Sequence, residues 1–217
     1  MNESEIQLFF IKMKKPILLM IILVVFVNAC TSPSDDLDRA NVGQIDQQKQ
    51  INNEKLRQDS DNVDESDKLT KVSFNKAESF FEFEGYGPGK SHIGTFDDGE
   101  MYFLYDNDKL VGFIGTIIPA SVKSDSGGLD KHLKTADFFN IDNFSKINAV
   151  STNIDKEKGQ INGELTFLGV TKELTFPATI TDNSVEAELV FDTTLWGMSY
   201  TGVNPEVRVS FKFVAKE

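Results

Sequence analysis

The chain has 217 residues, 40% of them hydrophobic, which is enough for one domain with a real core. Its formal net charge of −12 argues against nucleic acid as a partner, because phosphate backbones are recognised by basic surfaces. The single cysteine excludes an intramolecular disulfide and a cysteine-rich metal site. There are 18 phenylalanines against one tryptophan and four tyrosines. Since phenylalanine adds bulk without hydrogen bonding, this suits a wide apolar interior and a solid core equally well.

Residues 1–29 are predicted to be a lipoprotein signal peptide. Lys14 and Lys15 precede an apolar run, Ile17 to Val27, which is short for a membrane span but fits a signal-peptide core. The run ends in Val27-Asn28-Ala29-Cys30, which resembles the cleavage site of bacterial lipoproteins. Cys30 would then become the N-terminus and carry acyl chains, which together anchor a protein stably.

The residues on either side of the apolar run predict where translation starts and where the protein is located in the cell. Glu3 and Glu5 fit a signal peptide poorly, so Met13 is a candidate start; the alternative is a membrane-anchored helix from near Ile6. Thr31 follows Cys30, where an aspartate would favour retention at the inner membrane. We therefore expect an outer-membrane lipoprotein of the cell envelope, on its periplasmic side, with surface export a weaker alternative.

A polar linker is predicted to follow, up to residue 68. Thr31 to Lys68 has no aromatic residue and is rich in Asp, Asn, Gln and Ser. Such a segment buries too little apolar surface to offset its ordering entropy, so we expect a disordered linker. A helix over Val42 to Arg57 is the alternative.

Residues 69–217 are predicted to form an all-β domain, because apolar side chains recur with period two. Val185, Ala187, Leu189 and Phe191 alternate with largely polar neighbours, as expected for strands with one buried face. Further strands are predicted at 71–75, 80–84, 100–105, 110–118, 149–154, 164–167, 173–176 and 207–213, with turns between them, among them one at Gly85 to Gly89. About eight to ten antiparallel strands form either a solid sandwich or a closed barrel, and a barrel of about eight can hold one small ligand.

Several motifs of this domain resemble the YceI-like family of polyisoprenoid-binding, lipocalin-like barrels over about residues 70–216. The motifs are Ser91 to Thr95, Gly112 to Val122, His132 to Phe139, Ile161 to Thr171 and Phe191 to Tyr200. The most specific are HLKTADFF, similar to the family's HLKSxDFF, and GELTFLGVT, similar to its GxLTxxGVT. The chain departs from the family at Thr193, where the family usually has arginine, and at Gly127 to Lys131, which lacks an Arg-Asp pair.

The resemblance implies an antiparallel lipocalin-like β-barrel with a long apolar cavity. Family members bind isoprenoid chains such as quinones or polyprenyl phosphates and are not known as enzymes. By this resemblance we expect no cofactor apart from a bound isoprenoid lipid or quinone.

The stretch Leu129 to Asn140 is predicted to be a short helical lid. Leu129 and Leu133 are four residues apart and share one side of a helix. Burial of Phe138 and Phe139 is worth roughly 1.5–3 kcal/mol each, so at least one should point into the barrel. The segment is then either a plug that closes the core or a lid in contact with a ligand.

Neither histidine suggests catalysis or metal binding. His92 and His132 lack the spacing of a zinc site, which needs about three protein ligands. No Ser-His-Asp arrangement can be nominated either, because adjacency of Ser91 and His92 does not give triad geometry. We expect each histidine to fix a loop by hydrogen bonding, with His132 also a candidate contact for a polar head group.

The sequence therefore predicts a non-enzymatic, lipid-anchored envelope protein that carries or sequesters a long apolar ligand. The alternatives are an envelope interaction protein whose barrel is filled by its own side chains and a hydrolase using His92 or His132. The predicted ligand contacts are Phe74, Phe103, Phe113, His132, Leu133, Phe138, Phe139, Phe167, Phe176, Phe191, Trp196 and Phe211.

Overall fold

The structure, a computed structural model, describes residues 37–43 and 69–217. The predicted signal peptide, Met13 and Cys30 lie outside the described residues, as does most of the predicted linker. Among the helices of the described residues, none combines the length and the apolar character that crossing a membrane requires.

The described residues form thirteen strands, one short α-helix and two 3₁₀ helices. The strands are β1 (Asn41–Gly43), β2 (Thr70–Ser73), β3 (Phe80–Gly87), β4 (Lys90–Phe96), β5 (Gly99–Asp106), β6 (Lys109–Ile117), β7 (Val122–Ser124), β8 (Ile147–Asp155), β9 (Gln160–Phe167), β10 (Val170–Pro177), β11 (Thr179–Ile180), β12 (Ser184–Asp192) and β13 (Glu206–Val214). The helices are η2 (Pro119–Ser121), α3 (Gly127–Leu133) and η3 (Thr193–Trp196).

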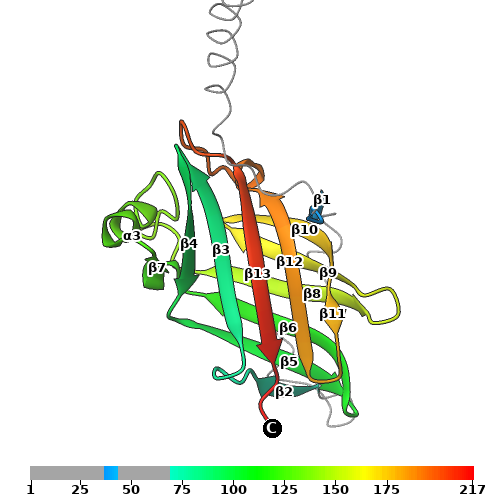
Figure 1. The fold of residues 1–217 in the computed structure, drawn as a ribbon. Helices are drawn as coiled ribbons and strands as arrows, with labels where there is room; N and C mark the ends of the chain where they lie inside the picture. Colours follow the sequence, from blue (N-terminus) through cyan, green and yellow to red (C-terminus); the bar gives the residue numbers. More distant parts are fainter. Residues whose placement is uncertain (1–36, 44–68) are drawn as a thin grey trace, which may run out of the picture.

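The strands are arranged in two antiparallel sheets that face each other. One sheet has the order β1-β10-β9-β8-β6-β5-β2 and the other β11-β12-β13-β3-β4-β7. In Figure 1 the strands of the near sheet run steeply and cross those of the far sheet, with α3 and β7 at one side.

Backbone hydrogen bonds join the two sheets into a barrel at two places. After β2 the chain crosses to β13, where Asn75 N–H donates to the carbonyl of Val214 at 2.7 Å and Lys216 N–H donates to that of Ser73 at 2.8 Å. Ahead of β1, Ala40 N–H donates to the carbonyl of Val190 in β12 at 2.9 Å, while β1 itself pairs with β10. The predicted all-β barrel is therefore confirmed.

Most predicted strands and turns occur where the sequence pattern placed them. The predicted strands at 164–167 and 173–176, which both read ELTF, lie in β9 and β10, and these are joined by a tight turn in which Leu168 and Gly169 have φ of 48° and 74°. The predicted turn over Gly85 to Gly89 is wrong in extent, because β3 continues through Gly87 and only Pro88 and Gly89 form the turn. Strand β1 lies inside the segment predicted as a linker.

Candidate ligand-binding cavity

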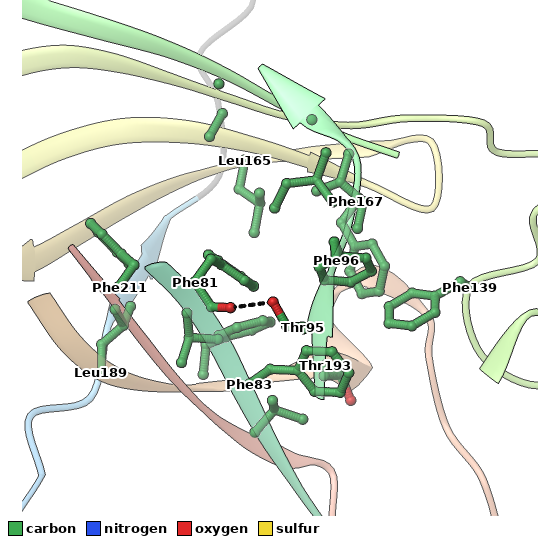
Figure 2. Close-up of a pocket in the computed structure, with 18 of the residues that line it drawn as sticks. Phe81, Phe83, Thr95, Phe96, Phe139, Leu165, Phe167, Leu189, Thr193 and Phe211 are labelled. Carbon is green, nitrogen blue, oxygen red and sulfur yellow. Dashed lines mark hydrogen bonds between the residues drawn. The ribbon is translucent and has the colours of Figure 1, made fainter. Parts of the chain in front are cut away.

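A cavity of about 530 Å³ lies between the two sheets. This is within the range of about 300–1,000 Å³ that is usual for small-molecule sites. Figure 2 shows Leu165 and Phe167 of β9 on one side of it, Leu189 and Phe211 of the other sheet on the opposite side, and the rings of Phe81, Phe83 and Phe96 between them. The barrel interior is therefore hollow over part of its length, with a mainly apolar wall.

Small residues at inward-facing strand positions keep this space open. Gly85 of β3, Gly115 of β6, Ala149 of β8 and Gly163 of β9 all line the cavity. Gly115 and Ala149 are direct partners across β6 and β8, so the far wall has a low, flat region. A Cβ atom added at Gly85 would have no heavy atom within 4 Å. A glycine inside a strand often marks a close approach of another group, and this signal was available in the sequence but not used there.

A cluster of phenylalanine rings forms the wall next to α3. The centroids of Phe83 and Phe96 are 5.4 Å apart, and Phe139 lies 6.1 Å and 5.5 Å from them. Phe83 lies directly over Gly94, where an added Cβ would come within 2.3 Å of the ring. Gly94 therefore allows Phe83 to lean across β4 toward the lid segment.

Nine of the twelve predicted ligand contacts line the cavity. They are Phe74, Phe113, Leu133, Phe138, Phe139, Phe167, Phe176, Phe191 and Phe211. The lining residues that the sequence analysis did not nominate include Phe81, Phe83, Phe96, Leu165, Leu174, Leu189, Val207, Val209 and Phe213.

Phe103, Trp196 and His132 do not line the cavity. Phe103 is fully buried in the solid part of the core, and Trp196 is only 1% exposed and donates its indole N–H to the carbonyl of Leu165 at 3.2 Å. His132 lies behind Phe138, with their ring centroids 5.0 Å apart. A side chain can thus have the right periodicity and still lie outside the hollow part of the interior.

The lid segment starts from a carboxylate anchor. Asp130 accepts hydrogen bonds from the N–H and the hydroxyl of Ser124 at 2.6 Å and 2.7 Å, which ties α3 to β7. These bonds lower the pKa of Asp130. Beyond α3, Phe138 and Phe139 are each 8% exposed and both line the cavity, so the segment is at once a plug and a wall of the site.

Both histidines take part in local hydrogen bonds with aspartates. His92 Nδ1 lies 2.6 Å from Asp125 Oδ1, and this hydrogen bond lowers the pKa of Asp125. His132 Nε2 lies 3.0 Å from Asp137 Oδ2. Within residues 37–43 and 69–217, no group of three His, Cys, Asp or Glu side chains is placed to hold a metal ion.

The cavity reaches solvent in two regions, which are identified by its exposed lining residues. The first, here called the acidic rim, consists of Lys76, Phe80, Asp97, Asp98 and Glu100. The second, here called the hydroxyl rim, consists of Thr194, Ser199, Tyr200 and Pro205 in the connection between β12 and β13.

Rings largely cover the hydroxyl rim. Tyr200 contacts Phe138 with centroids 5.3 Å apart and His132 with centroids 5.2 Å apart, so three rings of the lid and the loop lie together. Below them lies Thr193, at the position where the sequence analysis noted arginine as usual in the YceI-like family. Thr193 is buried, and its hydroxyl donates to the carbonyl of Pro205 at 2.9 Å. Its hydroxyl hydrogen is therefore already used within the loop.

Known proteins resemble this chain in sequence and in fold. A family model of the YceI-like domain matches residues 70–215. UPF0312 proteins of Staphylococcus aureus strains USA300 and MRSA252 are 35% and 36% identical over 111 residues, a match that covers 50% of this chain and 64% of each relative. The match thus spans less than two thirds of those proteins' length.

Two solved structures share the fold. Burkholderia cenocepacia BcnA superposes with a TM-score of 0.59 at 19% identity, covering 66% of this chain and 99% of that one. A polyisoprenoid binding domain from Saccharophagus degradans gives a TM-score of 0.53 at 13% identity, covering 69% and 100%. With the domain match extending from β2 to the end of β13, this chain belongs to the YceI-like family.

Proposed function

We propose that this protein binds a long apolar molecule, such as an isoprenoid lipid, inside its barrel and acts as a carrier or sequestering protein of the cell envelope. The observation that carries the proposal is the apolar cavity of about 530 Å³ between the sheets. The fold neighbour described as a polyisoprenoid binding domain supports the class of ligand. The predicted acylation of Cys30 supports anchoring at a membrane, where such ligands are found.

The size of the cavity favours an occupant. The cavity opens to solvent at both rims, so without a ligand water would have to enter a space of about 530 Å³ whose wall is mainly apolar. Contact between water and an apolar wall is unfavourable. An apolar chain that fills the space gains dispersion contacts and removes its own surface from water. The alternative of a barrel filled by its own side chains does not account for this space.

Binding without catalysis fits the polar groups around the cavity. Both histidines lie outside its wall and are hydrogen-bonded to aspartates. The hydroxyls of Thr95 and Thr193, which do line it, donate to backbone carbonyls. A hydrolase would need a nucleophile and a base in contact at the site.

Gly85→Leu tests the proposal by filling the cavity. The new side chain extends into open space, so the fold should be retained while the ligand is excluded. We expect calorimetric titration with geranylgeraniol to show a binding free energy weaker by roughly 1–3 kcal/mol than for the unmodified chain, which is about fivefold to 150-fold in affinity.

Gly87→Leu is the matched control. It makes the same change in the same strand, at a position that does not line the cavity, and should bind as the unmodified chain does. Equal affinities for both variants and the unmodified chain would place binding elsewhere and contradict the proposal.

A further inference from the structure

Acidic side chains outnumber basic ones on the cavity wall. Lys76 is the one cation among the described residues that line the cavity. The acids are Asp97, Asp98 and Glu100 on the acidic rim and Glu164, which is buried in β9. A phosphate head group is normally held by several cationic or N–H donors, and this wall places carboxylates at the opening instead.

Four threonine hydroxyls of the wall donate their hydrogens within the protein. Thr95 donates to the carbonyl of Phe81 at 2.7 Å, as Figure 2 shows, and Thr193 donates to that of Pro205 at 2.9 Å. Thr116 donates to Asn148 Oδ1 and Thr194 to Asp192 Oδ1. What remains on these oxygens are lone pairs, which accept hydrogen bonds but do not donate them.

The acidic rim is the more open of the two ends. Pairing between β3 and β4 stops at Phe83 and Gly94; beyond that point β3 pairs with β13 alone and β4 with β7. The bond from Thr95 to Phe81 bridges this break, and Phe80 beside it is 41% exposed. At the hydroxyl rim the rings of His132, Phe138 and Tyr200 lie together instead.

We propose that the cavity selects chains whose head group is uncharged or cationic and can donate a hydrogen bond, and that it discriminates against phosphorylated chains. The head group lies at the acidic rim, in the break between β3 and β4. An alcohol or ammonium donates to the rim carboxylates, whereas a phosphate dianion meets a net negative field. This inference rests on the proposed function and adds to it the chemistry of the ligand's polar end.

The test compares two probes with the same chain, geranylgeraniol and geranylgeranyl phosphate, by titration of the full chain. At low ionic strength the phosphate should bind roughly tenfold more weakly than the alcohol, and high salt should narrow this ratio because it screens the rim charges. The triple variant Asp97→Asn, Asp98→Asn, Glu100→Gln should narrow the ratio at low salt, because it removes the repulsion of the phosphate and replaces the carboxylates that accept from the alcohol by weaker amide acceptors.

A second triple variant, Asp106→Asn, Asp108→Asn, Glu157→Gln, removes the same formal charge from exposed positions off the cavity wall and should leave the ratio unchanged. Equal affinity for the two probes, or the same ratio in both triple variants and the unmodified chain, would overturn this inference while leaving the proposed function intact. Binding of neither probe would overturn the proposed function and this inference with it.

Discussion

Individual side chains determine how much of the barrel interior is empty and how its polar groups are satisfied. Gly85, Gly115 and Gly163 line the cavity without filling it, while phenylalanines supply the rest of the wall. Thr193 shows the second kind of role: it is 5% exposed, and its hydroxyl bonds to the carbonyl of Pro205, which holds the start of the loop from β12 against its end.

Replacement of Thr193 by valine should destabilise the protein without a change in side-chain size. The carbonyl of Pro205 would keep the hydrogen bond from the N–H of residue 193 and lose the one from the hydroxyl, at a cost of about 0.5–1.5 kcal/mol in the free energy of unfolding. Urea denaturation of the variant measures this cost. Thr152→Val, on an exposed position of β8, is the control and should unfold as the unmodified chain does; an equal free energy for both variants would show that the hydrogen bond is not stabilising.

At the scale of elements, period-two patterning predicted nearly all long strands. It succeeded for β12, where buried and exposed residues alternate from Val185 to Leu189, and for β13, where the buried residues Val209 and Phe211 are two apart. It did not delimit β4, because Gly94 replaces an apolar side chain on that strand and its space is taken by Phe83 from β3. Strand β1 was not predicted because three residues carry no period, and its pairing with β10 depends on distant sequence.

The lid segment makes the stability of the protein depend on pH through the carboxyl group of Asp130. Hydrogen bonds from Ser124 lower the pKa of this carboxyl in the folded state, so its contribution to stability is fully present above the unfolded pKa of about 3.9. The contribution is lost as the pH falls through the lower, folded pKa. We expect Asp130→Asn to lower the free energy of unfolding at pH 7, and the difference from the unmodified chain to shrink below about pH 4.

Unfolding curves at pH 7 and pH 3 check this expectation. Asp142→Asn, at an exposed position just after the lid segment, is the control and should show no such dependence. A difference between Asp130→Asn and the unmodified chain that stays constant with pH would contradict the assigned role of the carboxylate.

At the scale of the whole molecule, the hollow interior results from side chains that are far apart in sequence. Gly85 comes from one sheet and Gly115 and Gly163 from the other, so no local pattern reveals the space that they leave between them. Periodicity identifies which residues of a strand face inward, but not how far along the barrel axis each of them lies. For this reason it placed Phe113 and Phe176 correctly on the cavity wall and also nominated Phe103, which packs in the solid end of the core.

The most direct test of the account is to identify what the full chain carries when it is expressed in its native organism. The purified protein would be extracted and its lipids identified by mass spectrometry, in parallel with Gly85→Leu and Gly87→Leu. We predict one class of long-chain apolar molecule, near stoichiometric with the unmodified chain and with Gly87→Leu, and strongly depleted in Gly85→Leu. Lipid-free protein in all three preparations, or the same lipid content in all three, would contradict a barrel that binds its ligand in the central cavity.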